Sequence, residues 1–463
     1  MKTVAVVGGG ITGMSTMHYL QRQITAQQLP IQLVLIEKDA TLGGKMVTKK
    51  QGDFIMEVGA DSIVARHKSV MPLIEELNLQ EQIVYNDTGK SYILTNNELH
   101  AIPTNSVFGI PMDEAAIEAS TLVSAAGKEQ IYRDLTIPND RFTKEDSIGD
   151  FLAYFLGDEI VEKQIAPVLS GVYSGDLYKL TIASTLPNLL EYKNKYGSMI
   201  RGFEAHKELY DKTASKKFIS FEHGLVQLFD RMESVLTEAI IYKNTAVQSL
   251  EKKDNFYQVN LTNGAQIEAD YVVLATPHQV AEKLLPHPAL QQEFNKLQTA
   301  SIITVYLGYE MDDAVLPANG TGFIVSTHND VDCNACTWTS RKWHHTSPSG
   351  KLLIRMFYKK NNARFAEFSA MTEAELTAVA REDVRKSLHI EEEPNTVTIS
   401  KWMDLMPVYN LEHPQAVKGL EQKLRQNYPR VALAGSSYYG VGIGLCIQNG
   451  HDLATAIIEE LQE

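Results

Sequence analysis

The chain has 463 residues, a formal net charge of -14, and hydrophobic and charged shares of 44% and 22%. This length exceeds one ordinary hydrophobic core and predicts two or three domains, and the composition is that of a water-soluble globular protein. The acidic balance argues against nucleic acid or an anionic membrane as partner of the whole surface. No apolar run is long enough for a membrane span, and the glycines at 8–10 interrupt the first apolar run too early for a signal peptide, so we expect a cytoplasmic protein.

The chain opens with the pattern of a strand, a glycine turn and a helix. The strand at 3–7 is apolar throughout, as a buried parallel strand should be, and the helical pattern runs from the turn to about Gln27. A second apolar strand, Gln32–Ile36, ends at Glu37. The sequence therefore predicts a βαβ unit at the start of the chain.

The turn of this unit consists of Gly8, Gly9, Gly10, Ile11, Thr12 and Gly13. Gly8 permits a tight bend, Gly10 lets the backbone approach a pyrophosphate, and Gly13 lets the helix pack on the strand. The start of the helix offers free N–H groups to phosphates. Glu37 can bind a ribose hydroxyl, and its charge would repel the extra phosphate of an NADP-type ribose. The pattern predicts a dinucleotide site; the alternative is an ordinary glycine turn in an α/β protein.

Two further motifs follow Glu37. Gly43, Gly44 and Lys45 lie in a predicted tight turn that brings the chain back beneath the phosphates, which resembles the second flavin signature of glutathione-reductase-type flavoproteins. The segment 57–62 follows, where related flavoproteins bring backbone near the ribityl chain and ring. The order of the motifs favours FAD over NAD, with a plain surface turn as the alternative.

The middle of the chain, from about Arg66 to Tyr210, has helical periodicity in several pieces that prolines separate. The clearest pieces are 70–77, 112–126, 148–156 and 159–168. The stretch Lys193–Lys217 is charged and has few apolar anchors. We expect it to be a mobile surface excursion.

Later segments return to strand patterns. Val247 lies in a strand where such proteins clamp adenine by backbone, and the hairpin signal Asn263-Gly264 follows the strand at 256–261. Further strands are predicted at 271–275, 301–309, 351–358 and 430–434, and a helix at 373–388.

The glycine-rich stretch Gly435–Gly444 follows the last strand and opens a final helix at about 447–461. A helix N-terminus aimed at the N1–C2=O edge of a flavin would stabilise its reduced ring, and glycines allow the close approach. This stretch is therefore a third predicted flavin element. A helix-capping turn is the alternative.

The sequence offers little for other chemistries. No second Gly-x-Gly-x-x-Gly follows a strand, as a reductase fed by NAD(P)H would usually need, which favours an oxidase that passes electrons to O2. Cys333 and Cys336 have no partner pair at zinc spacing, and His344-His345 has no ligand set nearby, so we expect no metal site. Cys446 either packs at the start of the last helix or tethers a flavin.

Over nearly its whole length the chain resembles the soluble, FAD-dependent porphyrinogen oxidases of Gram-positive bacteria: the coproporphyrinogen III oxidases of the protoporphyrinogen oxidase family. Besides the flavin motifs, the resemblance rests on the stretches 166–176, 335–343, 402–409 and 440–443. It implies an α/β fold with α+β insertions: a Rossmann-like FAD-binding domain of the glutathione-reductase/amine-oxidase type, a mixed-sheet substrate domain and a helical domain. We place the FAD-binding domain at 1–65, 215–290 and 425–463, the helical domain at 66–214 and the substrate domain at 291–424.

The motifs and the resemblance together imply a set of FAD-binding residues. They are Gly8, Gly9, Gly10, Ile11, Thr12, Gly13, Glu37, Lys38, Gly43, Gly44, Lys45, Gly59, Ala60, Asp61, Ser62, Val247, Trp402, Gly435, Val441, Gly442 and Ile443. No strong catalytic base is implied, because pyrrole N–H protons can leave a porphyrinogen by tautomerisation.

The resemblance also implies the reaction, which is oxidation of coproporphyrinogen III to coproporphyrin III in haem biosynthesis. Six electrons would pass through FAD to O2, giving H2O2. The candidates near substrate are Arg66, His67, Lys68, Val168, Leu169 and Tyr173, with Lys179 and Arg201 as further cations for propionates. His67 stands where many Gram-positive members have lysine, so a mechanism that needs that lysine does not carry over.

Three alternatives stay open. The substrate could be protoporphyrinogen IX, which has vinyl groups in place of two propionates. The chain could be a flavin amine oxidase or desaturase with another apolar substrate. It could also be a flavin-binding interaction protein that hands porphyrin to a ferrochelatase-like partner.

Overall fold

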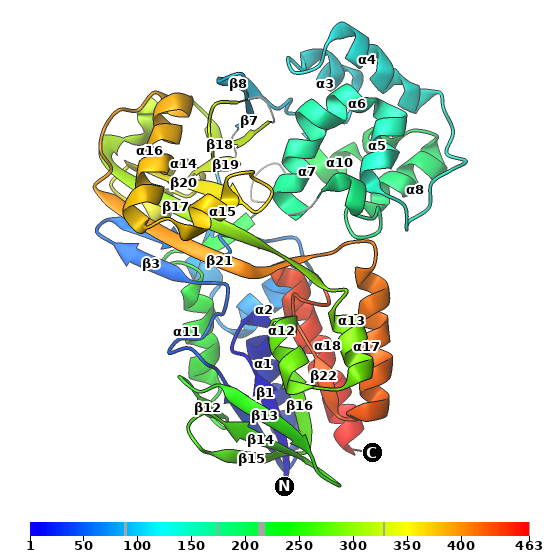
Figure 1. The fold of residues 1–463 in the computed structure, drawn as a ribbon, viewed down its shortest axis with the longest axis vertical. Coiled ribbons are helices and arrows are strands. Elements are labelled where there is room, and N and C mark those ends of the chain that lie inside the picture. The colour runs from blue at the N-terminus through cyan, green and yellow to red at the C-terminus, as the bar shows by residue number, and fades with distance from the viewer. Residues whose placement is uncertain (88–89, 174–175, 212–217, 327–328, 463) are drawn as a thin grey trace.

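The computed structural model describes residues 1–87, 90–173, 176–211, 218–326 and 329–462. Figure 1 shows three lobes: a lower lobe that contains both ends of the chain, an upper-left lobe built on a mixed sheet, and an upper-right lobe of helices. This arrangement confirms the predicted fold class.

The lower lobe is built on a five-stranded sheet of order β12-β2-β1-β16-β22, in which every neighbouring pair is parallel. Alternate residues of β1 enter different cores: Val4 and Val6 pack with helices α1 and α18, whereas Ala5 and Val7 pack on the opposite side. The strands are β1 (Lys2–Val7), β2 (Ile31–Ile36), β12 (Ile240–Tyr242), β16 (Tyr271–Leu274) and β22 (Val431–Leu433), and the helices are α1 (Ile11–Gln27) and α18 (Ile443–Gln462).

Helices and a small antiparallel sheet, β13-β14-β15, complete this lobe. Helix α17 shares the core of the opposite side with α12 and α13. The bounds are β13 (Val247–Lys252), β14 (Tyr257–Leu261), β15 (Gln266–Ala269), α2 (Val70–Glu76), α11 (Val226–Val235), α12 (His278–Leu284), α13 (Pro288–Phe294) and α17 (His413–Asn427). Short strands link it to the upper lobes: β3 (Thr48–Gln51), β4 (Phe54–Glu57), β5 (Ile63–Val64), β6 (Ile83–Tyr85) and β11 (Phe218–Phe221).

The upper-left lobe holds a seven-stranded sheet of order β21-β17-β20-β19-β18-β7-β8. The sheet is mixed because β18 and β7 run parallel while the other neighbours are antiparallel. Its strands are β7 (Lys90–Thr95), β8 (Glu98–Ala101), β17 (Gln298–Asp312), β18 (Gly320–Val325), β19 (Ala335–Trp338), β20 (Lys351–Lys359) and β21 (Thr396–Val408), and its helices are α14 (Thr339–Lys342), α15 (Phe365–Ala370) and α16 (Glu373–Leu388). Cys333 and Cys336 are buried in this lobe's core.

The upper-right lobe is helical and has a core of its own. Its helices are α3 (Glu114–Ala119), α4 (Ala125–Ile131), α5 (Ile148–Leu156), α6 (Asp158–Ile160), α7 (Ala166–Tyr173), α8 (Pro187–Tyr196), α9 (Met199–Ala205) and α10 (Lys207–Asp211), with short strands β9 (Ser106–Val107) and β10 (Ile110–Pro111). No helix in the described part of the chain combines the length and the apolar character needed to cross a bilayer.

The prediction of a mobile surface excursion at 193–217 is wrong for the residues of this stretch that the structure describes. Residues 193–211 form the end of α8 and helices α9 and α10, and Phe203 is fully buried. Lys193 is buried as well, and its ammonium donates to the Oδ1 of Asp134 over 3.0 Å. Because a buried carboxylate compensates this charge, the lysine belongs to the core. Residues 212–217 lie outside the described residues.

Candidate functional site

The glycine turn between β1 and α1 is closed on the side that faces the sheet. Gly8 has a φ of +105°, and a Cβ there would lie 2.5 Å from the carbonyl oxygen of Ala275. A Cβ on Gly13 would lie 1.9 Å from the carbonyl oxygen of Gly8. Only glycine fits these positions, so strand and helix approach as closely as the sequence motif predicts.

The other side of the turn is open. A Cβ built on Gly10 meets no described atom within 4 Å. Gly10 is the N-cap of α1, and among the described residues no side chain caps this helix and no acidic residue stands in its first turn. Free N–H groups and the positive end of the helix dipole therefore face open space, which suits a phosphate. Gly43 and Gly44 pack against this turn. The N–H of Gly43 donates to the carbonyl of Gly9 over 2.9 Å, and a Cβ on Gly44 would lie 3.2 Å from the Cα of Gly10.

Glu37 at the end of β2 is fixed against the same turn. Its Oε2 accepts the N–H of Gly9 over 2.7 Å, its Oε1 accepts the N–H of Asp39 over 2.9 Å, and the residue is buried. A carboxylate has about four lone-pair sites, so both oxygens keep acceptor capacity for ribose hydroxyls. The Glu37 carbonyl accepts the N–H of Thr245, which brings the start of β13 and Val247 to this place. Lys38 points into solvent and pairs with Asp39.

We expect Glu37→Ala to weaken FAD binding about 10- to 100-fold, because charge-assisted hydrogen bonds contribute about 1.5–3 kcal/mol each. The measurement is fluorescence titration of the apo-protein with FAD. Asp39→Ala is the matched control, since it removes an exposed carboxylate beside the site. Equal dissociation constants for Glu37→Ala and wild type would contradict the ribose role.

Lys45 lies at a junction of three segments. Its ammonium donates to the Oγ of Ser436 over 2.8 Å and to the carbonyl of Leu405 over 3.3 Å. Its own carbonyl accepts the N–H of Ala60 over 2.9 Å. Burial lowers the pKa of Lys45. The second flavin motif, the segment at 57–62 and the C-terminal glycine stretch thus meet at one residue, Lys45.

The segment 57–62 is held tightly. A Cβ on Gly59 would lie 2.0 Å from the carbonyl oxygen of Lys45 and 3.2 Å from the Trp402 ring, whose Nε1 donates to the carbonyl of Val58 over 2.8 Å. Asp61 forms an ion pair with Lys342 at 2.9 Å and accepts the hydroxyl of Ser62. Burial opposes ionisation of Asp61, but the positive charges of Lys342 and Arg355 outweigh it and lower its pKa to about 2. Asp61 is therefore a fixed negative charge between two lobes.

The C-terminal glycine stretch is held by Tyr409, which directly follows β21, and by Asn449 of α18. Tyr409 donates its hydroxyl to the carbonyl of Ser436 and accepts the N–H of Gly440, and Gly435 donates its N–H to Asn449 over 2.9 Å. Both Gly435 and Gly440 have positive φ angles, +94° and +113°. Helix α18 begins directly afterwards, at Ile443, with no acidic residue in its first turn. Its positive end is thus available to a ring edge, beside Val441 and Gly442.

The structure brings most of the predicted cofactor residues to one edge of the lower lobe, at the carboxyl ends of β1, β2 and β22. This is where ligands bind in open parallel sheets. Several residues that hold the site were missed: Arg355, Tyr306, Lys342, Tyr409 and Ser436. Arg355 had a signal of its own, because it is the one charge within the apolar run 352–358. Lys342, Tyr409 and Ser436 lie in stretches that the resemblance and the glycine motif had marked, but no pattern there picked out these three side chains.

The candidates for substrate contact are spread over two lobes. Arg66 and Lys68 are exposed, whereas the His67 ring packs on the start of α18, where a Cβ on Gly444 would lie 2.5 Å from its Cγ. Burial lowers the pKa of His67. Val168 and Leu169 are buried in the core of the helical lobe. The side chain of Tyr173 lies outside the described residues.

Sheet, glycine turn and buried carboxylate together define a dinucleotide-binding protein, and the three flavin elements that meet at Lys45 favour FAD as the dinucleotide. The chain belongs to the flavin containing amine oxidoreductase family, whose profile matches residues 11–458. This confirms the predicted cofactor and enzyme class.

Two relatives and one solved structure match the chain over nearly its full length. It is 34% identical to the coproporphyrinogen III oxidase of Bacillus subtilis, over 97% of this chain and 96% of the relative. The coproporphyrinogen III oxidase of Staphylococcus aureus is 30% identical, over 99% and 100%. A crystal structure from Exiguobacterium sp. 255-15, provisionally named protoporphyrinogen oxidase, superposes with a TM-score of 0.89 at 31% identity, covering 99% of both chains.

Proposed function

We propose that the chain oxidises coproporphyrinogen III to coproporphyrin III in haem biosynthesis, and passes six electrons and six protons to three O2 to give three H2O2. The observation that carries the proposal is the full-length match to the Bacillus subtilis enzyme of that name. The FAD site supports it, since β1 rises from the N-terminus at the bottom of the lower lobe, so that its carboxyl end points toward the upper lobes (Figure 1).

Bound FAD would supply the two-electron chemistry, three times per macrocycle. The residues of the chain itself would bind and orient the cofactor and the substrate. Gly10 and the start of α1 would hold the pyrophosphate, Glu37 the ribose, and the segment 57–62 with the start of α18 the ring. Pyrrole N–H protons leave by tautomerisation, so positioning and exclusion of water carry the catalysis.

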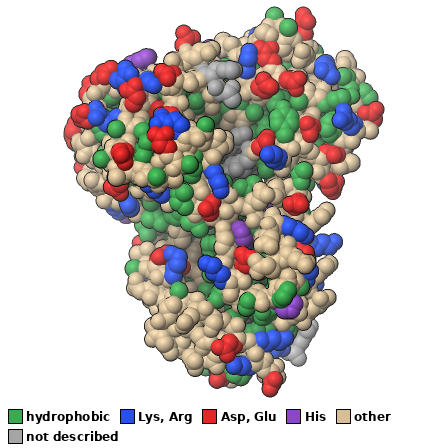
Figure 2. Space-filling model, in the orientation of Figure 1, with side chains coloured by type: hydrophobic (Ala, Val, Ile, Leu, Met, Phe, Trp, Pro, Cys, Tyr) green, Lys and Arg blue, Asp and Glu red, His purple; other side chains and the backbone are tan. Residues whose placement is uncertain are grey.

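Local cations would bind the propionates. Charged side chains of both signs are interspersed over the face in Figure 2, so a tetra-anion must rely on a few placed cations. Arg66 is exposed, and its charge acts on Tyr210 of α10, so it lies toward the helical lobe. Lys68 is exposed beside it. We infer that these two residues meet carboxylates at the mouth of the site.

The double variant Arg66→Gln, Lys68→Gln should raise the KM for coproporphyrinogen III about tenfold, which corresponds to ~1.4 kcal/mol of lost charge-assisted hydrogen bonding. The KM for protoporphyrinogen IX should rise less, because it has fewer propionates. Lys49→Gln, Lys50→Gln is the matched control, since it removes two exposed charges from β3. Equal changes of KM in the two double variants would contradict the assignment of Arg66 and Lys68 to the propionates.

The deciding experiment follows porphyrin fluorescence after enzyme and oxygen are added to each porphyrinogen, prepared anaerobically. Faster oxidation of coproporphyrinogen III supports the proposal. Faster oxidation of protoporphyrinogen IX favours the second candidate, which the name of the Exiguobacterium structure supports. If neither yields porphyrin while the protein holds FAD, a flavin amine oxidase or desaturase reaction replaces both.

We further propose that the enzyme works in the cytoplasm and hands its product to a ferrochelatase-like partner. Affinity capture with the holoenzyme and a purified ferrochelatase tests the partner. The domain boundaries at 65/66, 214/215, 290/291 and 424/425 also stay a proposal, which limited proteolysis would test.

A further inference from the structure

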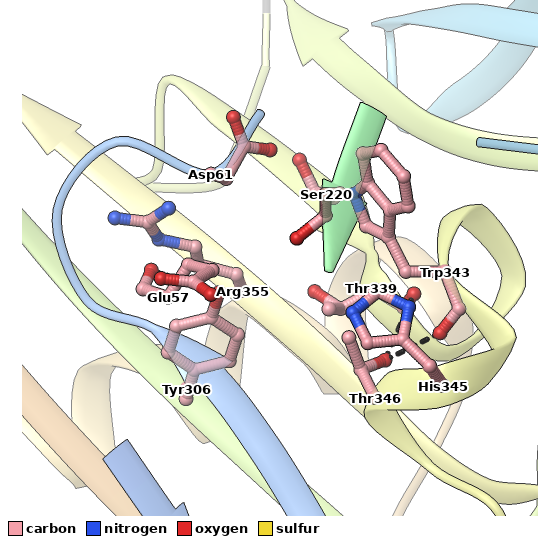
Figure 3. Close-up of a pocket in the computed structure, with 10 residues that line it drawn as sticks. Glu57, Asp61, Ser220, Tyr306, Thr339, Trp343, His345, Thr346 and Arg355 are labelled. Atoms are coloured by element: carbon pink, nitrogen blue, oxygen red, sulfur yellow. Dashed lines mark hydrogen bonds between the residues drawn. The ribbon is translucent and has the colours of Figure 1, made fainter. Parts of the chain in front are cut away.

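The back of the segment 57–62 borders a small, partly open cavity between the lower and upper-left lobes (Figure 3). The cavity offers about 10 Å³ to a water-sized molecule. Its walls come from the flavin-facing segment, from β11, from strands β17 and β20, and from the residues around α14.

Arg355 of β20 connects this cavity to the flavin-facing backbone. One guanidinium nitrogen donates to the carbonyl of Val58 over 3.1 Å and to the carbonyl of Gly59 over 3.0 Å. The Tyr306 hydroxyl donates to the preceding carbonyl, that of Glu57, over 3.1 Å. Because three successive carbonyls turn toward the upper-left lobe, the peptide N–H groups that follow them point the other way. Those of Val58 and Ala60 donate to the carbonyls of Val47 and Lys45 over 2.9 Å each, which leaves the N–H of Gly59 as the one without a partner among the described residues.

Four polar atoms of the cavity wall are left without a partner among the described residues. They are the Nε of Arg355, the Nε1 of Trp343, the Oγ of Ser220 and the Oγ1 of Thr339. A buried polar atom that stays unpaired costs about 1–3 kcal/mol. A cavity of this size holds one water, and a water needs two to four polar partners, which these atoms supply.

The carboxylates around the cavity do not fully neutralise the positive charge of Arg355. Arg355 is 4% exposed, and Asp61, the nearby fixed anion, is shared with Lys342. The second carboxyl, Glu57, is turned to the hydroxyl of Thr48 and the N–H of Leu225. Two cations thus face one shared carboxylate, and the excess positive charge is buried, where it is weakly screened.

We propose that Arg355, completed by one water in this cavity, is a positioning residue that presents the N–H of Gly59 to the ring of bound FAD and raises the midpoint potential of the flavin. The cation polarises the two peptides from behind, and its charge favours the added negative charge of reduced FAD. The inference rests on FAD binding from the proposed function and not on the substrate.

The test uses holoenzyme variants that separate charge from hydrogen bonding. Arg355→Gln keeps a donor and removes the charge, so the midpoint potential should move to more negative values and the FAD dissociation constant should rise about tenfold. Arg355→Lys keeps the charge but loses the planar fork, so FAD should bind more weakly while the potential stays nearer to wild type. Anaerobic photoreduction against reference dyes measures the potential without any porphyrinogen.

Arg364→Gln is the matched control, because it removes an exposed arginine from the same lobe, where it pairs with Asp332 and Glu367. It should leave potential and affinity unchanged. Wild-type values in Arg355→Gln overturn the proposal, and equal potential shifts in Arg355→Gln and Arg355→Lys overturn the role of charge. These outcomes leave the porphyrinogen assignment untouched.

A crystal structure of the wild-type holoenzyme decides the matter if the Arg355 variants do not fold. Density for one water in the cavity, together with a FAD ring that lies against the N–H of Gly59, supports the proposal. A dry cavity, or a ring that lies away from this segment, overturns it.

Discussion

Gly10→Ala is expected to weaken FAD binding about 10- to 100-fold while it changes the free energy of unfolding of the apo-protein by less than about 1 kcal/mol. Gly10 has a φ of -73° and a ψ of 176°, which alanine adopts without strain. Its Cβ would stand in the open space before the start of α1, where no described atom lies within 4 Å. The methyl group therefore meets nothing until the pyrophosphate arrives. Urea unfolding of the apo-protein and FAD titration measure the two quantities.

Gly13→Ala is the contrasting control, because its Cβ would lie 1.9 Å from the carbonyl oxygen of Gly8. That variant should lose stability and FAD binding together. Wild-type FAD affinity in Gly10→Ala would mean that the pyrophosphate does not approach this turn.

Glu57→Gln should abolish a pH dependence of stability that Glu57 causes. Burial raises the pKa of Glu57 to about 7, although the N–H of Leu225 and the hydroxyl of Thr48 oppose the shift. In the unfolded chain its pKa is near 4.5. Between these values the folded state holds a proton that the unfolded state has lost, so the free energy of unfolding falls as pH rises from about 4.5 to 7, by up to about 3 kcal/mol.

The measurement is urea unfolding of wild type and Glu57→Gln at several pH values from 4.5 to 8.5. Near pH 4.5 the two should be similar, and above pH 7 the variant should be the more stable one. Glu310→Gln, at an exposed position where the glutamate pairs with Lys351, should keep the wild-type slope. An unchanged slope in Glu57→Gln would show that the carboxyl is ionised throughout.

Local chemistry made the nucleotide site predictable. A strand, a glycine turn and a helix follow one another within the first 27 residues, and each glycine has a role that its neighbours fix. Glu37 ends the adjacent strand, so its place beside Gly9 follows from the parallel pairing of β1 and β2.

Contacts between distant segments were not predictable in the same way. The carbonyls that Arg355 binds lie 297 and 296 residues earlier in the chain, and no pattern around residue 355 names them. Lys193 was mistaken for a surface residue because its partner, Asp134, is 59 residues away. Strands β7 and β8 join the mixed sheet although they fall in the region predicted to be mainly helical, since strand pairing depends on the tertiary fold.

The parallel sheet of the lower lobe has a consequence for biosynthesis. Its strands come from residues 2–7, 31–36, 240–242, 271–274 and 431–433, and α18 packs along α1. A ribosome adds about 5–20 residues per second, so the first and the last strand of this sheet along the chain are made many seconds apart. The nascent chain therefore holds a complete glycine turn before β22 and α18 exist, and the C-terminal part of the FAD site is added only after α18 has left the exit tunnel.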